Sequence, residues 1–590
     1  MKQFLITMAG VFAGLVIFVV AVPVLLVMMA ASAARPEPLP AQAVLELDLR
    51  DGLTDQDAQN PLVSIGRRSM SVMSVIESLK HAESDGRVKG VLVRLPETGM
   101  APAAADELRE ALKRFRAAGK PVFAHSQGIY PAGVVTSTYM LGAAADELWM
   151  QPAASLQVTG LAAEDVFFKR AFDKYGVEVN FQQRQEYKNA VNPYLYSDYT
   201  PEHREAQLSW MGSVYRSALV SAATDRKTDP AALQKALEAG PYLAEEAQRL
   251  GLVDKVGQVK EAEKALLAKA GSGAKLVEFE DYLRHDRRRS ETGQAIAVIE
   301  AEGPIVTGDD GVANPLSGGS TIYADQVAEA IYAAAEDNDV KAIVMRVSSP
   351  GGSDTASEQI AAAVRAAKAA GKPVVVSMGT YAASGGYWIS AEASSIVAQP
   401  TTLTGSIGVY GGKLALGPAL ERFGVDLRQT SVGGPYADAY SLGQSFGPED
   451  EAAFSRWMDQ IYENFVTRVA TGRKLPVERV REIARGRVWT GAQARDLGLV
   501  DEVGGFYQAV EKAKALAGLK GEVRLKRMTP APTPIEALER LLGVSAASAR
   551  TLAAAAWLLG DPRAEAVLDE VARARMSQGR ALVMSPTPVR

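Results

Sequence analysis

Short apolar, β-branched runs alternate with longer segments of helical periodicity along most of this chain. Strands this short that alternate with helices of roughly 10 to 15 residues are typical of α/β units with right-handed crossovers. The pattern therefore predicts an α/β fold. In the second half of the chain the predicted strands are residues 295–300, 342–347 and 374–377, and the predicted helices are 323–336, 356–370 and a segment that starts at Ser384.

The same pattern occurs twice, because three sequence matches recur in order at a nearly constant offset. The matched pairs are Val88–Leu95 with Val340–Val347, Ala117–Val122 with Ala369–Val374, and Leu250–Asp254 with Leu497–Asp501. Ordered internal repeats of this kind indicate a duplicated architecture. We predict a first repeat at 41–270, a polar connector at 271–294, a second repeat at 295–518 and a helical C-terminal tail at 519–590.

The N-terminal segment predicts a membrane anchor within residues 1–40. No charged residue occurs between Phe4 and Ala34, and a membrane-spanning helix needs about 20 apolar residues. Lys2 precedes the run, which weakly places the rest of the chain outside the cytoplasm. A cleavable signal peptide is the alternative, because Ala31–Ala33 resembles a small-residue cleavage site.

Composition excludes several classes of function. The chain carries 64 Lys+Arg against 69 Asp+Glu, a net charge of -5, so it lacks the basic surplus that nucleic-acid binding needs. It contains no cysteine, which excludes disulfides, thiolate metal sites and a cysteine nucleophile. Covalent catalysis would therefore use another nucleophile.

A small-residue stretch, Ser377–Ser390, carries the strongest candidate for that nucleophile. Ser384 falls where a helix is predicted to begin, followed by Gly385 and Gly386. Helix N-terminal N–H groups can stabilise the oxyanion that develops during acyl transfer. A second glycine turn, with Gly351 and Gly352 after a predicted strand, could complete an oxyanion hole.

A serine nucleophile needs a base, and the residues alone leave its identity open. The four histidines, His81, His125, His203 and His285, all lie in the first half or the connector, and His125 is the strongest of them because it ends a predicted strand. A lysine base must be neutral, and lowering its pKa from about 10.4 to about 7 costs roughly 4 kcal/mol, so it must be buried.

Two motifs, Ser384–Ser390 and Thr402–Val409, resemble those of signal peptide peptidase A, a bacterial serine protease family with a Ser/Lys dyad. The tandem copies and the anchor are similar to the long form of that family. The resemblance implies a fold related to crotonases and the Clp protease, with two tandem domains of this kind after the transmembrane helix. In the family the lysine lies in a segment that here reads Tyr187–Tyr194. The resemblance implies that Lys188 is the base, that Ser406 hydrogen-bonds to the lysine amine, and that the Gly385 N–H is part of the oxyanion hole.

The duplication provides an internal comparison of the two copies. Tyr436–Ala437 stands where the first copy has Tyr187–Lys188, and the first copy lacks both glycine pairs. Each copy has thus kept one member of the dyad, which predicts one composite site. Asn189 and Asn192 replace the Ser and Glu of the family pattern. An alternative base is Lys413, which follows a glycine pair in the second copy.

The expected reaction is peptide hydrolysis through an acyl-enzyme, with no metal or organic cofactor. The resemblance implies remnant signal peptides as substrates, a ring-shaped homo-oligomer that is a tetramer by family pattern, and a place in the bacterial inner membrane with the catalytic domains in the periplasm. Three alternatives remain open at this point: a crotonase-like acyl-CoA enzyme, a catalytically silent membrane scaffold, and a broader quality-control protease.

Overall fold

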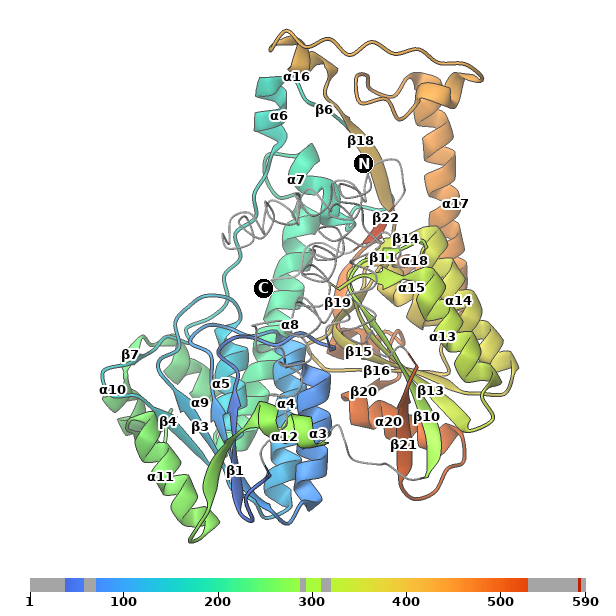
Figure 1. Ribbon diagram of the computed structural model, residues 1–590. Coiled ribbons are helices and arrows are strands. Elements are labelled where there is room, and N and C mark those ends of the chain that lie inside the picture. The colour runs from blue at the N-terminus through green and yellow to red at the C-terminus, as the bar shows by residue number, and fades with distance from the viewer. Residues whose placement is uncertain (1–37, 58–69, 287–292, 309–319, 529–581, 585–590) are drawn as a thin grey trace, which may run out of the picture.

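Two mainly parallel sheets, one from each half of the chain, form the body of the protein (Figure 1). The computed structural model describes residues 38–57, 70–286, 293–308, 320–528 and 582–584. The first sheet has the strand order β8-β4-β3-β2-β1-β9, with all neighbours parallel. Its strands are β1 Ala43–Asp48, β2 Val88–Arg94, β3 Val122–Ser126, β4 Glu147–Met150, β8 Lys255–Val256 and β9 Lys275–Glu278.

The second sheet repeats this order as β20-β16-β15-β13-β10-β21, and it adds β17 and β19 beyond the end of β15. The predicted α/β fold is therefore confirmed, and the sequence repeat corresponds to a repeat of strand order. The strands are β10 Gln294–Glu302, β13 Val340–Ser349, β15 Val374–Ala383, β16 Ser395–Ala398, β17 Leu403–Gly405, β19 Val488–Thr490, β20 Glu502–Val503 and β21 Val523–Arg527.

Helices cover both sheets. The first half contains α3 Val72–Ser84, α4 Pro102–Ala117, α5 Val135–Ala143, α6 Lys169–Tyr175, α7 Asn192–Leu195, α8 Pro201–Arg226, α9 Pro230–Glu238, α10 Ala244–Arg249, α11 Val259–Ala270 and α12 Phe279–Asp286. The second half contains α13 Ala324–Glu336, α14 Asp354–Ala369, α15 Gly385–Ala391, α16 Gly417–Glu421, α17 Pro448–Arg473, α18 Val477–Ile483, α19 Gly491–Asp496 and α20 Phe506–Leu516.

The repeated Gly-Lys-Pro sequence has the same structural role in both copies. Lys120 donates to the carbonyls of Ala82 and Asp85 at the C-terminal end of α3, and Lys372 donates to Ala334 at the end of α13. A lysine at a helix C-terminus satisfies carbonyls that have no intrahelical partner and interacts favourably with the helix dipole. This explains why the motif survives in both copies.

A third sheet joins the two copies. Its order is β12-β11-β14-β22-β18-β6, and β6 from the first copy runs antiparallel to β18 from the second. Figure 1 shows β6 and β18 extending away from the two main sheets. The strands are β6 Glu178–Gln183, β11 Ile305–Val306, β12 Ile322–Tyr323, β14 Gly351–Ser353, β18 Tyr410–Ala415 and β22 Leu582–Met584; β5 Ser155–Leu156 pairs separately with β7 Tyr242–Leu243.

A buried ion cluster also connects the copies. Arg346 on β13 forms a bidentate pair with Asp55, at 2.5 and 2.9 Å, and a further ion pair with Glu107 on α4. All three side chains are at most 3% exposed. Removing one partner of such a cluster leaves buried charges unpaired, so the cluster ties the first copy to the second.

Strand β15 is longer than predicted. The sequence predicts a strand that ends at residue 377, but the strand continues to Ala383 because Tyr381–Ala383 pair with β17. Position 379 in this strand is a glycine because a Cβ there would come within 2.6 to 2.8 Å of the Asp55 carboxylate. The glycine therefore marks a close approach, not a turn.

The predicted connector and tail also contain unexpected elements. Residues 275–286 form β9 and α12, which pack on the first sheet because Phe279, Tyr282 and Leu283 are apolar and buried. In the region predicted as a helical tail, the described residues form strands: β21 adds to the edge of the second sheet, and β22 joins the third. Most of that tail, 529–581 and 585–590, lies outside the described residues.

The predicted anchor in residues 1–40 falls almost wholly on residues 1–37, which lie outside the described part of the chain. Among the helices that are described, none combines the length and the apolar character that a membrane crossing requires.

Candidate active site

Ser384 occupies the turn between β15 and α15 in a strained backbone conformation. Its φ and ψ are 57° and −117°, a combination that residues other than glycine rarely adopt. The turn is held by the Ser384 N–H, which donates to the Gly405 carbonyl at 2.8 Å, and by the Trp388 N–H, which donates to the Ser384 carbonyl. A serine on a strained strand-to-helix turn is a recurring arrangement for a nucleophile.

Lys188 reaches this serine from the first copy. Its segment follows β6, and β6 is held by pairing with β18. The Nζ atom lies 2.6 Å from Ser384 Oγ, 2.8 Å from the Ser406 carbonyl oxygen and 3.0 Å from Ser406 Oγ. Lys188, Ser384 and Ser406 are each 0% exposed. The structure thus brings together three residues that lie in separate parts of the sequence.

Complete burial holds the pKa of Lys188 well below its ordinary value of 10.5, because the charged form loses its hydration. The hydrogen-bond geometry suits the neutral amine. A neutral amine has two hydrogens and one lone pair, so it can donate to the carbonyl and hydroxyl of Ser406 and accept from the hydroxyl of Ser384. This arrangement can take a proton from Ser384.

The loop 485–487 hydrogen-bonds to both the lysine segment and Ser406 and so fixes their relative positions. The sequence analysis did not identify this loop. The Tyr187 N–H donates to the Arg485 carbonyl at 3.0 Å, and the Ser406 N–H donates to the Arg487 carbonyl at 2.7 Å. Between them, Gly486 has a φ of +79°, and a Cβ there would lie 2.6 to 2.8 Å from the N, Cα and Cβ atoms of Lys188. Only glycine allows this approach.

The side chains of the same loop pack on Tyr187. The guanidinium groups of Arg485 and Arg487 lie 5.3 and 5.2 Å from the Tyr187 ring centroid, within the range of cation–π contacts. The residue before Lys188 is therefore held by side chains as well as by the backbone. The Arg-Gly-Arg triplet at 485–487 is a weak sequence signal, because its role depends on a partner about 300 residues away.

Two glycine turns meet beside Ser384. A Cβ on Gly385 would lie 2.7 Å from Ser357 Oγ and 3.0 Å from the Gly352 nitrogen, and a Cβ on Gly352 would clash with the Ile305 backbone. The Gly351 N–H donates to Ser349 Oγ at 3.1 Å, which fixes the first turn. Gly385 is the first residue of α15, and N–H groups in a first helical turn have no intrahelical acceptor. This pair of turns can bind an oxyanion.

The other candidate bases lie in different surroundings. Lys413 donates to the Ser441 carbonyl at 2.9 Å and packs 4.8 Å from the Phe446 ring centroid. His125 lies in the first sheet, where its Nε2 is 3.1 Å from the Gly257 carbonyl oxygen. The departures Asn189 and Asn192 are both buried and hydrogen-bond to each other at 3.3 Å.

The corresponding turns of the first copy are closed. A Cβ on Gly99 would lie 2.1 Å from the Val134 nitrogen, so that backbone fills the place next to the start of α5. Thr138 on this helix donates to the Thr98 carbonyl at 2.8 Å. The first copy thus lacks the open double-glycine turn that lies beside Ser384.

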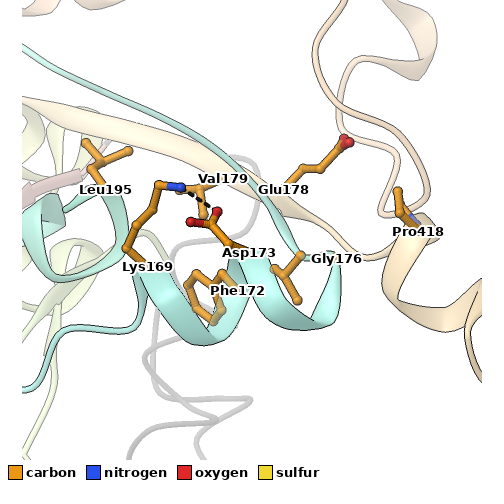
Figure 2. Close-up of a pocket in the computed structure, with 9 residues that line it drawn as sticks. Lys169, Phe172, Asp173, Gly176, Glu178, Val179, Leu195 and Pro418 are labelled. Carbon is orange, nitrogen blue, oxygen red and sulfur yellow. Dashed lines mark hydrogen bonds and ion pairs between the residues drawn. The ribbon is translucent and has the colours of Figure 1, made fainter. Parts of the chain in front are cut away.

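A separate hollow of about 390 Å³ lies between α6, β6 and the start of α16 (Figure 2). Lys169 and Asp173, which line it, form an ion pair with each other, and neither Ser384 nor Lys188 borders it. Within the described ranges, no group of three or more His, Asp or Glu side chains is placed to hold a metal ion.

Comparisons with known proteins show the class of protein to which this chain belongs. The sequence model of "Peptidase family S49" matches residues 114–272 and 366–520, one segment in each copy. Protease 4 of Salmonella typhi is 35% identical over 505 residues, covering 81% of this chain and 79% of that protein. Protease 4 of Haemophilus influenzae is 33% identical, covering 78% and 75%. The chloroplastic serine protease SPPA of Arabidopsis thaliana is 30% identical, covering 81% and 69%.

These proteins are serine proteases or carry protease names, and the matches extend over most of both partners, so this chain is a serine peptidase. It belongs to peptidase family S49, in the long form with matches in both copies. The resemblance seen in the sequence motifs is thereby confirmed.

Proposed function

We propose that this chain is a membrane-anchored endopeptidase in which Ser384 is the nucleophile and neutral Lys188 the general base. The observation that carries the proposal is the 2.6 Å contact between Lys188 Nζ and Ser384 Oγ in a fully buried environment. Family membership makes hydrolysis of peptide bonds the reaction. The acyl-CoA alternative has no support in the comparisons.

In the proposed mechanism, Lys188 takes the Ser384 proton as Oγ attacks the scissile carbonyl carbon. The N–H groups of Gly385 and Gly352 stabilise the oxyanion, and Gly351 holds the second turn in place. The protonated lysine then gives its proton to the leaving amine. Water, deprotonated by Lys188, hydrolyses the acyl-enzyme. Ser406 orients the amine throughout, because it accepts two of its hydrogen bonds.

The proposed substrates are apolar peptides, in particular signal peptides left in the membrane after cleavage. The support is the uncharged N-terminal run, which would anchor the chain in the bacterial inner membrane with its catalytic domains in the periplasm. A homotetramer is part of the same proposal, and it rests on the family resemblance. A broader role on misfolded envelope proteins uses the same residues.

The test compares two synthetic peptides of equal length, one with the apolar core of a signal peptide and one with a polar core. The full chain in mild detergent should cleave the apolar peptide at least about tenfold faster, with products identified by mass spectrometry, and the Ser384→Ala variant should be inactive. Equal cleavage of both peptides would favour broad quality control over signal-peptide digestion.

Anchoring is tested separately by alkaline extraction of bacterial membranes. The full chain should stay in the membrane pellet, and a chain lacking residues 1–40 should be released. Added protease should reach the catalytic domains in cells with a permeabilised outer membrane but an intact inner membrane. Release of the full chain by alkali would refute the anchor.

A further inference from the structure

Helix α8 of the first copy contacts the second copy through three polar side chains on one of its faces. Glu205, Ser209 and Ser213 follow one another at intervals of four residues, so they lie along one side of the helix. Helix α8 packs against β19 of the second copy (Figure 1). The partners of the three side chains lie in β19 or next to it; they are, respectively, Arg487, Gln493 and Thr490.

Strand β19 in turn supports the backbone of the catalytic residues. It pairs antiparallel with β17, and Val488 lies opposite Gly405. The carbonyl of Gly405 accepts the hydrogen bond from the Ser384 N–H, and the residue after Gly405 is Ser406. The stripe on α8 therefore holds the strand that holds the nucleophile and the partner of the lysine amine.

Of the three contacts, the one made by Glu205 reaches the loop 485–487. Its carboxylate accepts two hydrogen bonds from the Arg487 guanidinium, at 2.7 and 2.8 Å. A bidentate pair of this kind fixes the plane of the guanidinium as well as its position. The side chains of Arg487 and Glu205 are 15% and 51% exposed, and ion pairs that solvent reaches add little stability. The consequence of this pair is therefore orientation.

The guanidinium of Arg487 contacts two aromatic rings that lie next to the dyad. It lies 5.2 Å from the ring centroid of Tyr187, the residue before Lys188, and 4.4 Å from the ring centroid of Trp489. The Trp489 ring packs on Gly405, where a Cβ would lie 2.7 Å from the ring atom Cδ1. Contacts between a planar cation and a ring depend on the orientation of the cation. One carboxylate thus orients a cation that touches the neighbours of both dyad residues.

Arg487 depends on Glu205 for its side-chain hydrogen bonds. Glu205 accepts both of those that the guanidinium makes within the described part of the chain, and the buried Nε atom makes none there. A guanidinium that is largely buried and has lost its acceptors is costly. Without the carboxylate it should turn toward solvent and leave the two rings.

We propose that Glu205 is a positioning residue of the peptidase: acting through Arg487, it fixes the place of Lys188 relative to Ser384. The carboxylate itself lies outside the dyad and bonds to neither of its members. The inference rests on the proposed Ser384–Lys188 dyad and adds to it a residue that the sequence motifs do not contain. It depends on neither the membrane anchor nor the nature of the substrate peptides.

The test measures kcat and KM of the full chain and of Glu205→Ala for a quenched fluorescent apolar peptide. A misplacement of about 1 Å can cost on the order of 100-fold in rate, so a partial displacement of the lysine should lower kcat about tenfold. KM should stay within about twofold, because Glu205 does not bind substrate. A kcat within about twofold of the wild type, or a loss that falls on KM instead, would overturn the proposal.

Glu511→Ala is the matched control. Glu511 on α20 is also exposed, and it also accepts hydrogen bonds from a cation, Lys514, through both carboxylate oxygens. Its partner belongs to the same helix, so no contact between the copies is lost. Both variants should unfold at the urea midpoint of the wild type, because exposed pairs add little stability. Only Glu205→Ala should lose kcat, and an equal loss in Glu511→Ala would refute the positioning role.

Two further variants separate positioning from a general effect on structure. Glu205→Gln keeps one acceptor oxygen for Arg487, so its kcat should recover to within about threefold of the wild type. In an Arg487→Met background, Glu205→Ala should cause no further loss of kcat, because no guanidinium remains to be oriented. A second tenfold loss in the double variant would mean that Glu205 acts by another route, and the proposal would then be wrong.

Lys188→Ala in the same assay distinguishes a failure of this inference from a failure of the dyad. If Lys188→Ala is inactive while Glu205→Ala keeps its kcat, the dyad stands and the positioning role of Glu205 is refuted. If Lys188→Ala is active, the dyad is refuted and the positioning role falls with it. An inactive Lys188→Ala together with the tenfold loss in Glu205→Ala is the result that the proposal predicts.

Discussion

Gly486 offers the sharpest test of how the site is held together. An Ala Cβ there would lie 2.6 Å from the Lys188 backbone nitrogen, whereas ordinary contact begins at 3.4 Å, so Lys188 or the loop must move by about 0.8 Å. The contact between Lys188 Nζ and Ser384 Oγ is 2.6 Å, and a shift of that size takes it to the limit of a hydrogen bond. A misplacement of about 1 Å can cost on the order of 100-fold in rate, or about 2.7 kcal/mol.

The matched control is Gly371→Ala. Gly371 has a φ of +82°, close to the +79° of Gly486, but no atom lies within 4 Å of its Cβ position. Gly371→Ala should lose about 1 to 2 kcal/mol of unfolding free energy in urea, because it places alanine at positive φ. Gly486→Ala should lose at least as much, because it adds the clash with Lys188. Only Gly486→Ala should lose about 100-fold in kcat for a fluorescent peptide. A Gly486→Ala enzyme with kcat within about threefold of the control would refute this account of the loop.

Four further predictions concern the dyad and the ion cluster. Ser406→Ala removes one of the two Ser406 acceptors of the Lys188 amine, so kcat should fall about tenfold while KM changes little. The activity should rise with pH as Lys188 deprotonates, with an apparent pKa well below 10.5 in the kcat profile. The unfolded chain binds a proton at Lys188 below about pH 10.5, whereas the folded chain binds it only at lower pH. The free energy of unfolding of the wild type should therefore fall, relative to Lys188→Met, as the pH falls from 10.5 to the folded-state pKa of Lys188. A difference between the two chains that stays constant with pH in urea unfolding would contradict this prediction. Arg346→Met leaves Asp55 and Glu107 buried without their cation and should cost about 3 to 5 kcal/mol in urea unfolding, whereas a loss below about 1 kcal/mol would show that the cluster does not tie the copies together.

Patterns of neighbouring residues were sufficient to predict the features of the fold that are set by local sequence. The alternation of strands and helices, the duplication, and the glycine turns at Ser384 and Gly351 all follow from contiguous residues. The role of Lys188 as the base could be predicted only from the family motif and from the comparison of the two copies. Its contact with Ser384 depends on β6 crossing to the second copy, and no periodicity within the first copy indicates that crossing.

Features that depend on contacts between distant segments were missed. Gly379 lies beyond the predicted strand end at residue 377, but the structure places it within β15, where the Asp55 carboxylate approaches its backbone. No sequence pattern around Gly486 indicates its role, because its partner Lys188 is remote in sequence. Strand β22 is short and follows a long segment rich in alanine and proline, so only its pairing with β14 identifies it as a strand.

The measurement that tests the central claim most directly is the hydrolysis of a quenched fluorescent apolar peptide by the full chain and three alanine variants, at Ser384, Lys188 and Lys413. The account predicts that Ser384→Ala and Lys188→Ala each lose nearly all activity while remaining folded by circular dichroism, and that Lys413→Ala keeps kcat within about threefold. Retained activity in Lys188→Ala, or loss confined to Lys413→Ala, would contradict the dyad formed across the two copies.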